Sequence, residues 1–528
     1  MEKFKPYAFS LFAGILFALG YPSIFAKSLL ITPLIGTGIL FYFVLGADSL
    51  KIRILHLLAF NFTFNLFGFY WIAKTLVEFG ALPYPIAVLL STLFTLIITP
   101  HLWAAIFVIH YLSHKLHFLK HPETGLYAFS LSAFLTLFEY VIPQQFDVML
   151  GQSWVILGEY LGFASIAGLP IYSFFCYLLV FESLNFIKNR KYSKFNSISI
   201  ILFIILNPII GNSLTLDSNP LNIRVVQANI SNFLKMESEQ GGYASTGQVI
   251  DRYRVLSLAK YETGKKLDLI IWPETAYPFA VKTNKEDISY SYTPSVFNEV
   301  AQTQDAEMLA GGYDIKNSDH NETLFKTEYN TAFQVSKSGK LKNSYHKQIL
   351  IPFGETLPFG SFINELLSKY IENISFFSEG EKFTLFNLDS GHKLITTICY
   401  ELLKPEFIRS YLNSLNERPH AMINLTNDSW YGDTMEPEQH LFLAKWRALE
   451  FNLPIIRSTN TGITSVIYPD GSESKRLEVL KTGNLDLSIN LPLQEATFYQ
   501  KFGFATILPL WIIYLIFHLL LLKLKHDK

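Results

Sequence analysis

The sequence of 528 residues is short of charged side chains. Only 16% of its residues are charged and 50% are hydrophobic, whereas a soluble protein carries roughly 25% charged residues. This shortage excludes an entirely soluble chain and predicts a membrane protein with a sizeable soluble part. The net charge of −1 gives no indication of a nucleic-acid partner or of an acidic one. The chain is also too long for one small domain.

Cysteine is equally scarce, since the chain has only Cys176 in an apolar run and Cys399 in the polar half. Neither has a suitable partner, so we expect no disulfide. The sequence also lacks internal repeats, low-complexity tracts, a nucleotide-binding glycine loop and paired Cys/His spacing typical of metal sites. His346 and His440 are isolated and are interpreted as structural histidines. We therefore expect no metal and no cofactor.

Long apolar segments are abundant, in contrast. A membrane-spanning helix needs roughly 20 apolar residues. Seven segments precede the polar half and one follows it, at about 7–22, 29–47, 54–73, 83–111, 126–144, 160–185, 196–211 and 504–522. The first lacks a small-residue cleavage site, so we interpret it as a retained helix and not as a signal peptide.

The loop charges predict the orientation of these eight spans. With the N-terminus in the cytoplasm, most basic loop residues fall on the cytoplasmic side, including Lys51, Arg53, the cluster at 188–194 and the C-terminal tail. This arrangement follows the positive-inside rule. We expect a transmembrane domain of seven helices at 1–211, an extracytoplasmic domain at 212–503, and a last helix with a cytoplasmic tail at 504–528.

The hydrophobic period changes from Asn222 onward. Strand-like runs begin with 223–229 and 267–272 and recur at 307–312, 329–336, 382–388, 393–399, 419–426, 453–458, 463–468 and 483–490. Helical stretches lie at about 246–262, 293–304, 404–414 and 436–451. Apolar runs that alternate with helices are typical of a layered α/β domain in which both sheet faces are covered.

The stretch Thr396–Leu403, TTICYELL, places Cys399 where a buried strand ends. A helix is expected to begin just beyond, at Pro405. Helix N-termini favour the thiolate, so this position suits a nucleophile. A buried structural cysteine is the alternative.

Two other strand ends carry charges between apolar residues, Glu274 after Ile271–Trp272–Pro273 and Lys347 after His346. Burying a charge alone costs several kcal/mol, so each should be paired. If the three strands are neighbours, a carboxylate that can accept the thiol proton and an ammonium that can hold an oxyanion converge on Cys399. A structural ion pair between Glu274 and Lys347 is the alternative.

These residues stand within the segments VVQANI (225–230), LIIWPETAYP (269–278), YNTAF (329–333), YHKQILIPFGETLP (345–358), ICYELL (398–403), NLTNDSWYGD (424–433), EQHLFLAKWRALE (438–450) and RSTNTGITSVI (457–467). This ordered set resembles the carbon–nitrogen hydrolase (nitrilase) superfamily, and within it the membrane-bound family of apolipoprotein N-acyltransferases. The membrane part is similar mainly in span count and topology. The resemblance implies an αββα sandwich beside a polytopic α-helical membrane domain.

The resemblance also implies roles for individual residues. Glu274 would be the general base, Lys347 the stabiliser of the oxyanion and Cys399 the nucleophile. The accessory active-site residues that it implies are Glu355, Tyr400 and Glu401.

One position departs from the family pattern. Met236 stands where the family can carry Trp, and Met can replace an apolar contact but not an indole N–H. Besides Met236, we expect Phe353, Phe359 and Trp430 to line the substrate entrance, with ordinary packing of the loops as the alternative.

The implied activity is acyl transfer through a Cys399 thioester, from a membrane phospholipid to the N-terminal amine of a diacylated apolipoprotein. We expect a monomer in the bacterial inner membrane, with the catalytic domain on the periplasmic side, both termini cytoplasmic and no nucleic-acid partner. A membrane-tethered amidase or nitrilase-type hydrolase is the main alternative. A transporter with an inactive receptor domain is a third, disfavoured because the spans hold few buried charges.

Overall fold

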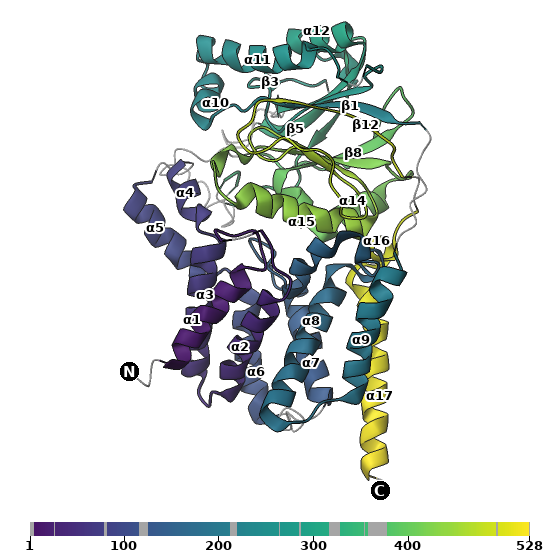
Figure 1. Cartoon of the computed structure of the whole chain (residues 1–528). Coiled ribbons are helices and arrows are strands. Elements are labelled where there is room, and N and C mark those ends of the chain that lie inside the picture. The colour runs from purple at the N-terminus through teal and green to yellow at the C-terminus, as the bar shows by residue number, and fades with distance from the viewer. Residues whose placement is uncertain are drawn as a thin grey trace, which may run out of the picture.

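The computed structural model of the chain describes residues 5–25, 27–78, 82–115, 125–211, 219–262, 264–284, 287–315, 328–352, 354–356, 377–492 and 495–526. Figure 1 shows a bundle of long helices beneath a β sandwich that is itself covered by helices. The bundle consists of α1 (Lys5–Ala18), α2 (Thr32–Gly46), α3 (Leu50–Gly68), α4 (Trp71–Glu78), α5 (Tyr84–Leu93), α6 (Pro100–Lys115), α7 (Gly125–Val141), α8 (Ala164–Asn189), α9 (Lys194–Ile209) and α17 (Leu508–His526).

Eight apolar helical stretches lie where the sequence predicts eight spans. Four are long enough to cross a membrane, Leu50–Gly68, Tyr84–Leu112, Ala164–Asn189 and Phe498–Leu520. The other four, α1, α2, α7 and α9, have 14 to 17 residues. The apolar side chains on the outside of the bundle, such as Ile201 and Ile516, are exposed in the isolated chain. An exposed apolar face of this extent suits a lipid environment.

Two predicted segments differ from their predicted form, and one helix lies outside the predicted ones. The segment predicted at 54–73 ends as helix α3 at Gly68, and α4 follows after a turn. The segment at 83–111 is interrupted by a 3₁₀ turn, Phe94–Leu96, before α6 begins at Pro100, because proline cannot continue a helix. The stretch 143–160, for which no helix is predicted, contains the 3₁₀ helix η4 (Leu150–Tyr160). Trp154 there donates its indole N–H to Cys176 Sγ at 3.0 Å, which fixes η4 against α8.

The sandwich consists of two sheets. The first has the strand order β12-β1-β2-β4-β5-β6, with β3 beside β4, and the second has the order β11-β10-β9-β8-β7. The strands of the first are β1 (Leu221–Gln227), β2 (Leu269–Trp272), β3 (Ala280–Val281), β4 (Glu307–Ile315), β5 (Glu328–Val335), β6 (Leu341–His346) and β12 (Gly483–Ile489). Those of the second are β7 (Phe386–Asn387), β8 (Lys393–Ile398), β9 (Ala421–Thr426), β10 (Ile455–Thr459) and β11 (Ser465–Ile467).

Four layers result, in the order helices, sheet, sheet, helices. Alternate residues of a strand point to opposite faces, so Val225 and Ile271 belong to the core between the sheets, whereas Val226 and Ile270 face the outer helices. On the first sheet these helices are α10 (Asn232–Glu239), α11 (Tyr243–Leu258) and α12 (Ser295–Gln304), and on the second they are α14 (Pro405–Ser414) and α15 (Glu436–Phe451). The structure therefore confirms the αββα sandwich.

Helix α15 joins the sandwich to the bundle. Phe442 and Trp446 belong to the core of the bundle, whereas Leu441 and Ala448, on the same helix, belong to the core of the sandwich. Figure 1 shows α15 lying along the boundary between the two parts. Because both faces of this helix are buried, the two parts are packed as one body along it.

Candidate active site

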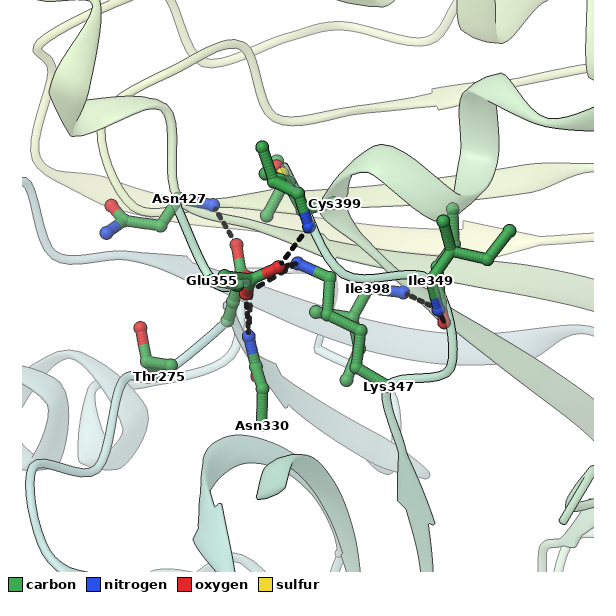
Figure 2. Close-up of polar contacts among 12 residues, drawn as sticks. Thr275, Asn330, Lys347, Ile349, Glu355, Ile398, Cys399 and Asn427 are labelled. Atoms are coloured by element: carbon green, nitrogen blue, oxygen red, sulfur yellow. Dashed lines mark hydrogen bonds and ion pairs between the residues drawn. The ribbon is translucent and has the colours of Figure 1, made fainter. Parts of the chain in front are cut away.

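The ends of three strands meet at one place in the sandwich. Glu274 follows β2 and Lys347 follows β6 in the first sheet, while Cys399 follows β8 in the second. Figure 2 shows Lys347, Cys399 and Glu355 close together, with Asn330 and Asn427 beside them. The three strand ends singled out in the sequence thus converge across the two sheets.

Glu274 and Lys347 form a buried ion pair. The distance from Lys347 Nζ to Glu274 Oε1 is 3.2 Å, and the side chains are 0% and 7% exposed for Lys347 and Glu274. Asn330 Nδ2 donates to the same carboxylate oxygen at 2.8 Å, and the backbone N–H of Asn427 donates to the other at 2.9 Å. Three donors therefore hold the Glu274 carboxylate in one orientation.

Glu355 is the second partner of Lys347. The Lys347 ammonium lies 2.8 Å from the Glu355 carboxylate, which also accepts from Asn330 Nδ2 at 3.1 Å and from Ile351 N–H at 2.9 Å. Burial disfavours the charged ammonium, but Glu274 and Glu355 outweigh this effect, so the pKa of Lys347 is raised. Lys347 therefore stays charged, as a group that binds an oxyanion must.

Asn330 and Asn427 were not among the predicted site residues. Both lie in segments that carry the family resemblance, but an asparagine alone does not indicate a site. The detectable signal is position, because Asn330 lies within the largely buried strand β5 and is 2% exposed. A buried amide needs partners, and here it bridges two carboxylates.

Cys399 has a left-handed backbone conformation, with φ of 50°. It is the first residue of the 3₁₀ turn η6 (Cys399–Leu403), and α14 begins only at Pro405. Strand β8 thus ends just before Cys399 and α14 begins at Pro405, as the sequence predicts, but η6 separates the thiol from the first turn of α14. Burial, and after it the negative charge of Glu274, raises the pKa of Cys399, while Lys347 lowers it. The resting side chain is a thiol that needs a base, and not a preformed thiolate.

Glu401 connects the Lys347 loop to the Cys399 strand. Its carboxylate accepts the backbone N–H groups of Gln348 at 2.6 Å, Ile349 at 3.1 Å and Ile398 at 2.7 Å, and the Tyr345 hydroxyl at 2.9 Å. Each of these contacts involves a residue beside Lys347 or Cys399. Glu401 thereby fixes the loop that carries Lys347 relative to the strand that leads to Cys399.

The Tyr400 side chain is directed to the bundle. Its hydroxyl donates to the backbone carbonyl of Gln145 at 2.6 Å. Next to it, Lys404 Nζ lies 3.0 Å from Asp147 Oδ1. The turn that carries Cys399 is therefore anchored to the helical part of the chain.

Of the four residues predicted for the substrate entrance, Met236 and Trp430 lie in the described part of the chain. Met236 is on α10 and is 38% exposed, and Trp430 ends the short 3₁₀ helix η7 (Asp428–Trp430), half-buried. Phe353 and Phe359 lie outside the described residues.

One cluster of possible metal ligands occurs among the described residues. Asp428, Glu436 and His440 offer ligand atoms that lie within 4.8 Å of one another, and all three are buried. Arg457 Nη2, however, already lies 2.8 Å from Asp428 Oδ2. A guanidinium paired with one of the ligands disfavours a further cation at this place.

Comparison with known proteins agrees with this geometry. The sequence model described as "Carbon-nitrogen hydrolase" matches residues 222–490, about half of the chain, so the chain belongs to the carbon–nitrogen hydrolase family. A second model, described as "Apolipoprotein N-acyltransferase N-terminal domain", matches residues 13–181. The combination of the two, one on the sandwich and one on the bundle, narrows the similarity to the membrane-bound acyltransferases of this family.

Similar curated proteins carry the corresponding name. The apolipoprotein N-acyltransferase of Bdellovibrio bacteriovorus is 28% identical over 425 residues, which cover 78% of this chain and 75% of that one. The enzyme of the same name from Haemophilus ducreyi is 27% identical, over 87% of this chain and 86% of that one. The match to the Allorhizobium ampelinum protein is 32% identical but spans less than half of each chain, 48% and 44%.

A solved structure is similar to the sandwich alone. Nit3 from Saccharomyces cerevisiae, a member of the nitrilase superfamily, is 18% identical and has a TM-score of 0.36. The match covers 52% of this chain and 91% of that one. A score this low says nothing about the residues of the site.

Proposed function

We propose that this chain N-acylates lipoproteins, moving a fatty acyl group from a membrane phospholipid to the N-terminal amine of an S-diacylglyceryl cysteine. The observation that carries this proposal is the convergence of Glu274, Lys347 and Cys399 beside a bundle in which the described residues form eight apolar helical stretches. A carboxylate, an ammonium and a thiol suit acyl transfer. The bundle supplies the two lipid substrates with a path from the bilayer.

In the first half of the reaction, Glu274 accepts the Cys399 proton and the thiolate attacks the ester carbonyl of the phospholipid. The Lys347 ammonium stabilises the oxyanion that forms on the carbonyl oxygen. When the C–O bond of the ester breaks, Glu274 returns its proton to the leaving alcohol. A lysophospholipid departs, and the acyl group remains on Cys399 as a thioester.

In the second half, the amine of the lipoprotein cysteine attacks the thioester carbonyl. Glu274 accepts a proton from the amine as the C–N bond forms, and Lys347 again holds the oxyanion. The C–S bond then breaks and the Cys399 thiol regains its proton from Glu274. A covalent intermediate of this kind gives ping-pong kinetics.

The boundary between the sandwich and the bundle contains a small cavity with apolar and polar lining, which is too small to hold an acyl chain. This cavity has a volume of about 30 Å³ and lies between α15 and the helices. Its apolar lining comes from the bundle, from α15 and from Leu403, the last residue of the turn that Cys399 begins. The apolar lining residues are Phe69, Trp71, Phe146, Leu403 and Leu443.

The proposal extends to location and assembly. The sandwich faces the periplasmic side of the inner membrane and both termini are cytoplasmic, as the loop charges predict. A monomer suffices for the proposed chemistry, because Glu274, Lys347 and Cys399 all belong to one chain. Hydrolysis with water as the acceptor is not favoured, since similarity to the acyltransferases includes the helical part as well as the sandwich.

Intact-mass measurement of the purified enzyme after incubation with phospholipid alone tests the proposal. We expect one added acyl mass on Cys399, removable by hydroxylamine, and its transfer to a synthetic diacylated lipopeptide added afterwards. Cys399→Ala should acquire no acyl mass, whereas Cys176→Ala should behave as the unaltered enzyme. Free fatty acid without N-acylated peptide would indicate a hydrolase, and acyl transfer by Cys399→Ala would refute the thioester.

A further inference from the structure

A network of buried polar side chains holds the backbone of Cys399. A non-glycine residue in the left-handed region is strained, and Cys399 has φ of 50°. Its carbonyl oxygen accepts a hydrogen bond from Asn424 Nδ2 at 3.4 Å. The same amide nitrogen lies 3.3 Å from Thr397 Oγ1. Asn424 therefore contacts both the nucleophile and the strand that leads to it.

Asn424 is in turn oriented by Arg457. Arg457 Nη1 donates to Asn424 Oδ1 at 3.0 Å, which leaves the amide nitrogen to face Cys399. The two residues stand opposite each other on the neighbouring strands β9 and β10, and Asn424 also stands opposite Thr397 on β8. These residues form one row across β8, β9 and β10, and hydrogen bonds through Asn424 connect the Arg457 guanidinium to the Cys399 carbonyl.

The other side of Arg457 is fixed by Asp428. Arg457 Nη2 lies 2.8 Å from Asp428 Oδ2, and both side chains are 0% exposed. His440 Nδ1 on α15 lies 3.5 Å from Asp428 Oδ1. The packing around the pair is close, because a Cβ atom on Gly462 would lie only 1.9 Å from Asp428 Oδ2. The network cannot shift without disturbing several elements.

We infer that Arg457 is a positioning residue for the nucleophile: held by Asp428, it orients Asn424, and Asn424 fixes the Cys399 backbone so that the thiol faces Glu274 and Lys347. Arg457 is not a catalytic residue, since it contacts none of these three side chains in the described structure. It affects the position of the thiol only through the backbone conformation of Cys399. The inference rests on the proposed function in so far as Cys399 is the acyl carrier.

The chain offers a matched control for this arginine. Arg224 and Asp486 form another ion pair, at 2.7 Å, whose side chains are likewise 0% exposed. That pair joins β1 to β12, at the far edge of the first sheet. Arg457→Lys and Arg224→Lys both keep the positive charge and lose the planar fork of the guanidinium. Only Arg457→Lys removes the hydrogen bond to Asn424.

The test measures single-turnover formation of the Cys399 thioester from phospholipid in both variants. We expect Arg457→Lys to lower the rate constant about 100-fold with little change in the phospholipid concentration at half-saturation, because the loss is one of orientation. Arg224→Lys should lower the thermal midpoint but keep the rate constant. The inference is overturned if folded Arg457→Lys retains the rate within about threefold, or if Arg224→Lys loses as much.

A second pair of variants covers the case in which Arg457→Lys does not fold. Gly462→Ala should displace Asp428 and slow thioester formation, whereas Gly247→Ala, where nothing lies within 4 Å of the added methyl group, should not. Equal rates in the two variants would overturn the inference.

The rate at which iodoacetamide alkylates Cys399, measured by peptide mass, reports on the position of the thiol and does not depend on acyl transfer. A thiol displaced from Lys347 loses the charge that favours its thiolate, so Cys399 should react about tenfold more slowly in Arg457→Lys than in Arg224→Lys. Equal alkylation rates would overturn the inference. If the unaltered enzyme forms no thioester while the alkylation rates still differ, the proposed function fails and the positioning role stands.

Discussion

At the scale of single residues, the reactivity of Cys399 is set by two opposite charges in a buried site. Burial and the Glu274 carboxylate raise its pKa, and the Lys347 ammonium lowers it. Lys347 is also paired with Glu355, at 2.8 Å. The thiol therefore stays protonated at rest, which lowers its reactivity towards electrophiles.

Replacing Glu274 should change the reactivity of the Cys399 thiol and the rate of acyl transfer in opposite directions. Glu274→Gln removes a negative charge that raises the pKa of Cys399, so this pKa should fall and the alkylation rate should rise at a lower pH than in the unaltered enzyme. Acyl transfer should nevertheless fall by about 10²- to 10⁴-fold, because the general base is lost. The measurements are the pH profile of iodoacetamide alkylation and the rate of thioester formation. Glu299→Gln, at an exposed ion pair with Arg254, is the control, and an unchanged alkylation profile in Glu274→Gln would contradict the prediction.

Glu401 is the residue whose loss should disturb both partners of the thiol at once. Glu401→Gln replaces one accepting oxygen by an NH₂ group that faces backbone N–H donors. An unsatisfied buried donor costs about 1–3 kcal/mol, so the free energy of unfolding should fall by this amount. We also expect the acyl-transfer rate to fall, by up to about tenfold. Thermal unfolding and steady-state kinetics check both effects. Glu417→Gln, on the surface, should change neither, and full activity of Glu401→Gln would count against the role of this carboxylate.

At the scale of elements, α15 joins the two parts through side-chain hydrogen bonds as well as apolar contacts. Gln439 Nε2 donates to the carbonyl oxygens of Pro22 and Gly68, both at 2.6 Å, and Trp71 Nε1 donates to Gln439 Oε1 at 3.0 Å. Seven residues further along, Trp446 Nε1 donates to the carbonyl of Gln152 at 3.0 Å. The position of the sandwich over the bundle is therefore specified at both ends of one helix.

Removing Gln439 should loosen this connection. Gln439→Ala leaves the Trp71 indole N–H and two buried carbonyl groups without partners, at a cost of about 2–4 kcal/mol. We expect a lower thermal midpoint in detergent and faster proteolysis between the two parts. The matched control is Gln302→Ala, which removes one exposed hydrogen bond to Ser338. Equal thermal midpoints in the two variants would show that Gln439 does not stabilise the junction.

The elements that sequence reasoning finds are those that depend on local pattern. The eight apolar stretches and most strands follow from hydrophobic period, and Glu274 and Lys347 stand out because charges at the ends of apolar strands need partners. The strand predicted at 382–388 is only Phe386–Asn387, and β6 and the two-residue β3 were not among the predicted strand runs. Asn330 and the 3₁₀ helix at Leu150–Tyr160 were missed, because their partners are distant in the chain and no local pattern indicates them.

At the scale of the whole molecule, the bundle forms one end and the sandwich forms the other. Figure 1 shows that α1 begins and α17 ends at the end of the bundle farthest from the sandwich. Helix α9 leads up from that end to β1, and α17 returns to it. The sandwich is thus tethered at both of its ends, which holds the site at a fixed height above the bundle.

Labelling of introduced cysteines should establish which side of the membrane the sandwich occupies. Tyr243 on α11 is 95% exposed, and Tyr192 is 56% exposed beside the basic residues 188–194 that precede α9. Because one apolar helix separates the two positions and basic loops stay in the cytoplasm, a membrane-impermeant maleimide should label Tyr243→Cys in intact spheroplasts and Tyr192→Cys only after lysis. Both are made in a chain that also carries Cys176→Ala and Cys399→Ala, so that no other thiol reacts. The opposite pattern would place the sandwich in the cytoplasm, where the acyl-transfer site would face the other leaflet of the bilayer.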